Sequence, residues 1–103
     1  MFVILWEYEV KPGYEEMFET AYGPQGDWAR LFQSDSQYRQ TRLLRDVSRP
    51  RRYFTLDYWD TEQSFEVFHV AHQAAYAVLD RSTVGLTLSE RRLAAFVLAP
   101  SDR

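Results

Sequence analysis

The side chains best suited to chemistry lie on the segment from Arg52 to Trp59, whose alternating pattern predicts a β-strand. One face of this strand carries only apolar or aromatic groups, and the other mixes polar groups with large rings. The two sets are Phe54, Leu56 and Tyr58, and Tyr53, Thr55, Asp57 and Trp59. The apolar face predicts a core position. The mixed face, with two hydroxyls, a carboxylate and an indole, predicts the wall of a small-molecule pocket.

Asp57 is the candidate base of this pocket. Beside an apolar interior, desolvation would raise the pKa of its carboxyl group, so it could accept a proton from a phenol or an activated C–H group. The alternative is a structural carboxylate paired with Arg42 or Arg45 of the neighbouring predicted strand. The sequence leaves both interpretations open.

His69 and His72 are spaced for one face of a predicted helix, three residues apart. This spacing would allow shared metal ligation, or one imidazole could act as a general base. No third ligand is evident near them, which favours hydrogen-bonded packing or a single histidine at the pocket mouth over a metal site. Tyr8, Tyr53 and Tyr76 could donate hydrogen bonds to a substrate oxygen, although buried tyrosines usually find partners within the protein.

The elements that must position these residues follow the order β-α-β-β-α-β. The predicted strands span 2–10, 38–46, 52–59 and 92–99, and the helices span 14–32, with a break at Gly23-Pro24, and a long segment after Asp60 or Thr61. The apolar stripe of that second helix comprises Phe65, Phe68, His69, His72, Tyr76 and Leu79. This order predicts an α+β, ferredoxin-like fold with an antiparallel sheet and both helices on one of its faces.

Composition limits the function classes. The chain has 103 residues, enough for one domain over 1–103, and a net charge of −3, which gives no general attraction to nucleic acid or anionic membranes. It contains no cysteine, so thiolate catalysis, disulfides and cysteine-based metal sites are excluded. The N-terminus has no signal-peptide pattern and no apolar stretch reaches membrane-spanning length, so we expect a cytoplasmic location.

Aromatic residues make up 17% of the chain, more than one small core can hide. The strands carry rings on both faces, and the face without helices must be covered. We therefore expect a homodimer in which two sheets meet.

The sequence resembles the antibiotic biosynthesis monooxygenase-like domains of the dimeric α/β-barrel superfamily over nearly its whole length. The matching segments are the aromatic first strand ending in Lys11-Pro-Gly13, Tyr22-Gly-Pro, Trp28-Ala-Arg-Leu-Phe32, Thr41-Arg-Leu-Leu-Arg45, and Tyr53 through Trp59 leading into Phe65 and Phe68. The resemblance implies the ferredoxin-like fold and dimeric barrel. It does not select one reaction, because relatives include quinone-forming monooxygenases, haem-degrading enzymes and members without known activity.

In the quinone-forming branch, a Trp at the end of the third strand and an Asn four residues before it are implicated in holding substrate and oxygen. Trp59 matches the Trp, and Thr55 stands where the Asn would be. The haem-degrading branch uses an Asn on the first strand, a Trp like Trp59 and a histidine ligand on the second helix. Trp6 occupies that Asn position, and His72 or His69 could stand in for the ligand.

Three hypotheses follow. The first is a monooxygenase that needs no cofactor and oxidises a small aromatic or polycyclic phenol with dioxygen. In it Trp59, Trp6 and Tyr53 enclose the ring system, Thr55 and Tyr8 bind its oxygens, and Asp57 or His72 accepts the proton, with His69 and Tyr76 as further contacts. The second is a non-catalytic ligand-binding or accessory dimer, and the third is a haem-binding, haem-degrading relative.

Overall fold

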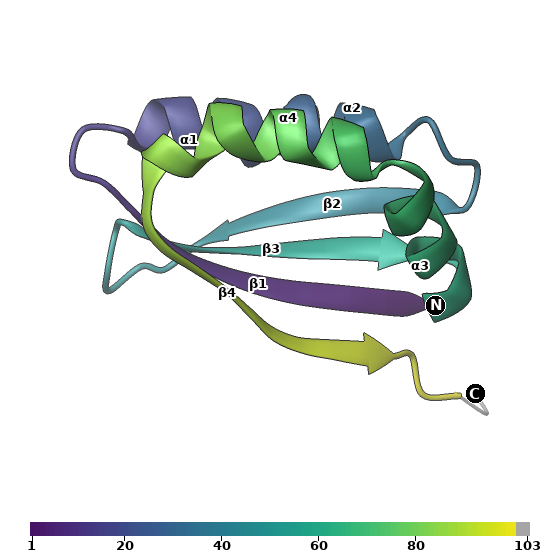
Figure 1. The fold of residues 1–103 in the computed structure, drawn as a ribbon. Helices are drawn as coiled ribbons and strands as arrows, with labels where there is room; N and C mark the ends of the chain where they lie inside the picture. Colours follow the sequence, from purple (N-terminus) through teal and green to yellow (C-terminus); the bar gives the residue numbers. More distant parts are fainter. Residues whose placement is uncertain (101–103) are drawn as a thin grey trace.

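The structure, a computed structural model, describes residues 1–100 and consists of one sheet with helices on one face (Figure 1). Its elements are β1 (Phe2–Val10), α1 (Glu15–Tyr22), α2 (Asp27–Phe32), β2 (Tyr38–Arg45), β3 (Arg52–Trp59), α3 (Glu62–Ala71), α4 (Gln73–Thr83), the 3-10 turn η1 (Val84–Leu86) and β4 (Thr87–Val97). The strands lie in the order β2-β3-β1-β4, and every neighbouring pair is antiparallel. The predicted ferredoxin-like fold is confirmed.

The break in the first helical region is also confirmed, but the prediction of one long second helix is wrong. Two helices, α3 and α4, meet at His72, whose backbone is not helical (φ −117°, ψ 27°). Its Nδ1 lies 3.0 Å from the carbonyl oxygen of Phe68. The chain therefore changes direction in the middle of the predicted stripe, and residues before and after His72 face different surroundings.

Of the two residues predicted to cap α3, Asp60 and Thr61, it is Thr61 that does so. Thr61 accepts a hydrogen bond from the Ser64 amide at 3.0 Å, and the Ser64 hydroxyl accepts one from the Thr61 amide at 3.2 Å. This reciprocal pair satisfies two amides that a helix leaves free at its first turn. Asp60 is instead bound by the guanidinium of Arg39, so it does not cap the helix.

The two faces of the sheet differ in burial, and one prediction about them is wrong. The mixed face of β3 points toward the helices and is fully buried, whereas the apolar face points away from them and is only half-buried in the single chain. The prediction that Phe54, Leu56 and Tyr58 form the core therefore fails, because the helices cover the opposite face.

Two aromatic clusters fill the space between sheet and helices. One surrounds Trp59, and the other surrounds Phe18 and Tyr53. The partly buried rings of Trp6 and Trp28 pack against both clusters. The core is thus divided into two ends, with these indoles between them. Within residues 1–100, no helix is both long and apolar enough to cross a membrane.

The backbone approaches itself closely at Gly26, just before α2. A Cβ at this position would lie 2.4 Å from the carbonyl oxygens of Thr20 and Ala21, whereas a Cβ at Gly85 would meet nothing within 4 Å. We predict that Gly26→Ala lowers the free energy of unfolding by about 1–3 kcal/mol, as overpacked sites do, and that the control Gly85→Ala changes it much less. Urea unfolding of both variants measures this difference, and equal losses would contradict the close approach.

Candidate functional site

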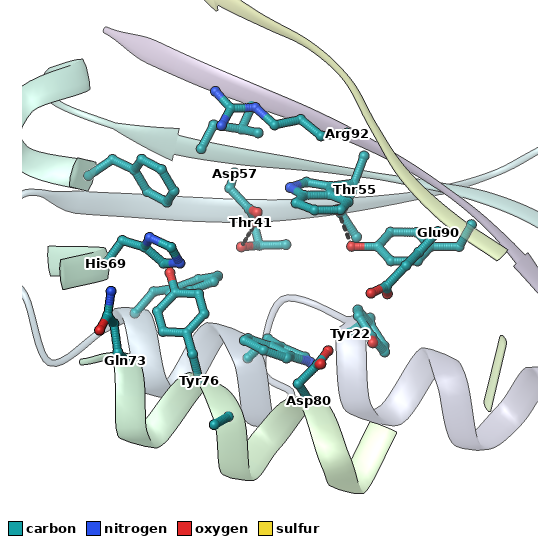
Figure 2. A pocket seen from close by; sticks show the side chains of 17 residues that line it. Tyr22, Thr41, Thr55, Asp57, His69, Gln73, Tyr76, Asp80, Glu90 and Arg92 are labelled. Atoms are coloured by element: carbon teal, nitrogen blue, oxygen red, sulfur yellow. Dashed lines mark hydrogen bonds between the residues drawn. The ribbon is translucent and has the colours of Figure 1, made fainter. Parts of the chain in front are cut away.

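A cavity of about 590 Å³ lies between the inner face of the sheet and helix α4 (Figure 2). Its wall is mostly aromatic and aliphatic, with a few polar groups from β2, β3, β4 and α4. The lining residues are Ile4, Trp6, Tyr8, Tyr22, Trp28, Phe32, Thr41, Thr55, Asp57, Phe65, His69, Gln73, Tyr76, Ala77, Asp80, Glu90 and Arg92. An apolar hollow of this size with a few converging polar groups is typical of small-molecule sites.

The structure brings together six of the nine residues predicted from the sequence. Those that line the cavity are Trp6, Tyr8, Thr55, Asp57, His69 and Tyr76. The expectation that Trp59, Tyr53 and His72 line it is not met.

Each of these three residues has a physical reason to lie elsewhere. Trp59 is 0% exposed and packs behind the cavity wall, with its ring 5.7 Å from Phe32 and 5.6 Å from Phe65. Tyr53 lies in the other aromatic cluster, where its hydroxyl donates to Glu19 at 2.5 Å. His72 lies at the junction of α3 and α4, where its ring stacks on Phe68 at 4.0 Å.

Asp57 is the buried carboxylate of the cavity. It is 8% exposed, and its Oδ1 accepts a hydrogen bond from the Thr41 hydroxyl at 2.7 Å. Since Thr41 uses its one proton on Asp57, the Tyr38 hydroxyl, 2.7 Å from Thr41 Oγ1, must be the donor to that oxygen. The hydroxyls thus form a directed chain of hydrogen bonds from Tyr38 through Thr41 to the carboxylate. Among residues 1–100, no arginine forms an ion pair with Asp57.

Burial controls the pKa of Asp57. Desolvation raises it from 3.8 to about 6, and the Thr41 hydrogen bond opposes that rise by favouring the ionised form. The sequence interpretation of Asp57 as a desolvated carboxylate therefore agrees with the geometry, and the alternative of pairing with Arg42 or Arg45 does not. Thr41 was not predicted as part of the site, although it lies on the strand paired with β3 and directly opposite Asp57.

Tyr8 and Thr55 occupy a second polar position on the sheet. Their hydroxyl oxygens lie 3.2 Å apart in buried surroundings, and burial raises the pKa of Tyr8 well above its ordinary value. Both side chains are neutral and already share one hydrogen bond. Thr55 can make fewer hydrogen bonds to a ligand than a free amide could, because its hydroxyl already shares one with Tyr8.

Tyr76 reaches across the cavity from α4 toward the sheet (Figure 2). Its hydroxyl is buried and has no hydrogen-bond partner among residues 1–100. Burial, followed by the charge of Asp57, raises the pKa of this hydroxyl, so it remains a proton donor at neutral pH. The His69 ring stands edge-on to the Tyr76 ring, with centroids 4.5 Å apart.

The far end of the cavity is acidic. Asp80 of α4 and Glu90 of β4 face the hollow beside Tyr22 (Figure 2), and burial, followed by the charge of Asp80, raises the pKa of Glu90. Arg92 lies on the sheet side, with its guanidinium 6.0 Å from the centre of the Phe65 ring. Glu90 was missed because β4 begins at Thr87, five residues before the strand predicted from the sequence. Arg92 is the first residue of that predicted strand but was not predicted as part of the site.

The residues present do not fit haem held through His72. Its Nδ1 is engaged by the Phe68 carbonyl, and the residue is not part of the cavity wall. His69 does line the cavity, but within the described part of the chain no group of three or more His, Asp or Glu residues could hold a metal ion.

Comparison with models of known protein families identifies the family of this chain. The family model described as antibiotic biosynthesis monooxygenase matches residues 1–78. The chain belongs to this family. A comparison with curated protein sequences found no match.

Solved structures of the antibiotic biosynthesis monooxygenase fold align with almost the whole chain. A candidate enzyme of this kind from Bordetella bronchiseptica has a TM-score of 0.73 at 17% identity, covering 96% of this chain and 97% of its own. Another from Deinococcus radiodurans has a TM-score of 0.75 at 10% identity, with 100% and 97% coverage. A mutant of SnoaB, a cofactor-independent oxygenase from Streptomyces nogalater, has a TM-score of 0.74 at 14% identity, with 98% and 95% coverage. At these identities the likeness establishes the fold.

The raised pKa of Asp57 predicts a specific pH dependence of stability. The folded state keeps the proton up to about pH 6, whereas the unfolded chain releases it near pH 4, so the stability due to this proton is present below pH 4 and is lost as pH rises through 6. Two pKa units correspond to about 3 kcal/mol. Asp57→Asn keeps an acceptor for Thr41 but has no proton to release. We predict that the unfolding free energy of the variant minus that of the parent protein rises by up to that amount from pH 4 to pH 8.

Urea unfolding of both proteins at pH 4 and pH 8 tests this prediction. Taking the difference between variant and parent removes the contribution of the other carboxylates, which the two proteins share. A difference that stays constant across this range would show that Asp57 titrates normally.

Proposed function

We propose that this family member is a cofactor-independent monooxygenase that oxidises a small aromatic or polycyclic phenol with dioxygen. The observation that carries the proposal is Asp57, a buried carboxylate with a raised pKa that faces an aromatic cavity. The family match supports a monooxygenase, and the similar fold of an oxygenase described as cofactor-independent supports chemistry carried by the substrate itself.

The cavity has the volume and lining for a small aromatic ring system. Its volume of about 590 Å³ lies within the range of about 300–1,000 Å³ that small-molecule sites occupy. Trp6, Trp28 and Phe65 supply aromatic faces and edges around the hollow, where a planar substrate would be desolvated and held in one orientation. Trp59 supports this wall from behind, through Phe32 and Phe65.

Proton removal is the step that the protein can assist most directly. An ordinary phenol has a pKa near 10, like the tyrosine side chain, and a normal carboxylate is too weak a base for it by about 6 units. At a pKa of about 6, Asp57 narrows that gap to about 4 units. Hydrogen bonds from Tyr76 or Thr55 to the substrate oxygen would stabilise the phenolate that forms.

The overall reaction balances with dioxygen alone. The phenolate is electron-rich enough to give electrons to dioxygen, and a C–O bond forms at a ring carbon that loses its hydrogen. One oxygen atom remains as the new quinone carbonyl, and the other leaves as water with the two hydrogens of the substrate. The substrate loses four electrons and dioxygen gains four, so no further reductant is needed.

The second candidate is a ligand-binding dimer without catalysis, and one observation favours it. Thr55 stands where quinone-forming relatives carry Asn, and its hydroxyl is engaged with Tyr8 at 3.2 Å. A site that lacks a free amide would bind a phenol and leave dioxygen unassisted. This alternative predicts saturable binding without oxygen uptake.

A homodimer completes the proposal. The sheet face away from the helices carries Val3, Leu5, Phe54, Leu56 and Tyr58, all half-buried in the single chain, with Leu44 and Phe96 more exposed. Pairing places Leu5 opposite Leu56 and Phe54 opposite Leu44, so these side chains form an apolar patch across neighbouring strands. Arg42, opposite Leu56, and Glu7, opposite Phe54, border this patch. A second copy with the same surface would cover it by two-fold symmetry.

Oxygen uptake tests the reaction. Purified protein with anthrones, naphthols or hydroquinones is expected to consume dioxygen, and Asp57→Asn should lower turnover by about 10²-fold or more, as loss of a general base does. Asp27→Asn, a change at an exposed aspartate on α2 outside the cavity, is the matched control and should retain the parent rate. Ligand binding with no uptake from any of these compounds would favour the second candidate.

Association tests the dimer. We predict that Leu56→Arg, which places a charge beside Arg42 on the apolar face, produces a monomer in sedimentation velocity experiments. Val67→Arg is the control, because Val67 is 60% exposed on α3, away from that face. A parent protein that sediments as a monomer at micromolar concentration would refute the pairing.

A further inference from the structure

We infer that Asp57 and Tyr76 together form a subsite for one hydroxyl group of the substrate, bound as donor to the carboxylate and as acceptor from the tyrosine. The inference rests on the proposed function, because it takes the same cavity as the substrate site. It adds that Asp57 and Tyr76 bind the same oxygen at the same time, and that this pair selects a hydroxyl over an ether, a ketone or a carboxylate. Neither the family match nor the similar folds identify these residues.

Asp57 supplies the acceptor. Its only hydrogen bond within residues 1–100 is the one that Thr41 donates to Oδ1, and a carboxylate with two oxygens can accept several more. The side chain is nine-tenths buried in the cavity wall, where bulk water cannot easily satisfy the remaining capacity. A buried carboxylate in this state favours a ligand that brings a donor.

Tyr76 supplies the donor. Its hydroxyl is buried without a partner in the described part of the chain, although buried tyrosine hydroxyls normally have one. The hydroxyl points from α4 toward the sheet strands that carry Thr41 and Asp57 (Figure 2), and the charge of Asp57 acts on it. The unsatisfied donor and the unsatisfied acceptor thus face one region of the cavity from opposite walls.

The chemistry of this pair selects one functional group. A hydroxyl can donate to Asp57 and accept from Tyr76 through the same oxygen, so it satisfies both residues at once. A methyl ether has no proton for Asp57, and a ketone has none either. A carboxylate would add a second negative charge beside Asp57, which is unfavourable in a desolvated site.

The rest of the cavity agrees with a neutral hydroxylated ring. Phe65 of α3 and Trp6 of β1 line the hollow and supply an apolar wall for the body of the ligand. Asp80 and Glu90 place further negative charge at the far end, which disfavours a ligand with an acidic substituent there.

Equilibrium binding without oxygen tests the subsite separately from catalysis. The probes are 1-naphthol and 1-methoxynaphthalene, titrated anaerobically against the parent protein with tryptophan fluorescence as the signal. We expect naphthol to bind at least tenfold more tightly, because each lost hydrogen bond to a charged or buried group corresponds to about a tenfold change or more. Tyr76→Phe and Asp57→Asn should each reduce this ratio severalfold, mainly through weaker naphthol binding.

Tyr14→Phe is the matched control, because Tyr14 is 41% exposed, outside the cavity, and should leave the ratio unchanged. Equal affinity of the parent protein for the two probes would overturn the inference, as would an unchanged ratio in Tyr76→Phe or no binding of either probe. Failure of the proposed reaction would appear differently, as a retained naphthol preference with no oxygen uptake in air.

Discussion

The rest of the site depends on the burial of one carboxylate, Asp57, against an aromatic interior with a single hydroxyl partner. Removing an ionised carboxylate from water is unfavourable, and the Thr41 hydrogen bond offsets only part of that cost. The result is a pKa of about 6, at which the group can hold or release a proton near neutral pH. The aromatic framework of the chain makes this possible, because the rings on the sheet and helices exclude water from the carboxylate.

The fold places the parts of the site on different elements, and each has a distinct physical task. The central strand β3 carries Asp57, β2 supplies the hydroxyl that orients it, and α4 brings Tyr76 over the opposite wall (Figure 2). The turn at His72 sets the direction in which α4 crosses the sheet. Behind the wall, Trp59 contacts four other rings, and two of them, Phe32 and Phe65, line the cavity. Rigidity behind the wall suits a site that must orient a flat ligand.

Much of this fold could be predicted from sequence because period-two alternation and turn residues determine β1, β2 and β3 directly. Alternation in β3 also placed Thr55 and Asp57 on one face and so predicted the pocket wall. Alternation could not say which face the helices cover, because both faces carry rings, and it could not show that Trp59 lies behind the wall. The break at His72 has no glycine or proline signal, and the polar start of β4 hid Glu90. Thr41 became visible only through the pairing of β2 with β3.

The protonation of Asp57 is the most direct test of this account. The protein can be labelled with carbon-13 at its aspartate carboxyl groups and titrated by NMR between pH 3 and pH 9, with Asp57→Asn used to assign the resonance. We predict a midpoint near 6, and a further rise of the pKa of Asp57 in Thr41→Val, where the hydrogen bond that favours the ionised form is removed. A midpoint near 4 in the parent protein would contradict it, because a carboxylate that titrates normally is neither desolvated nor suited to accept a phenolic proton.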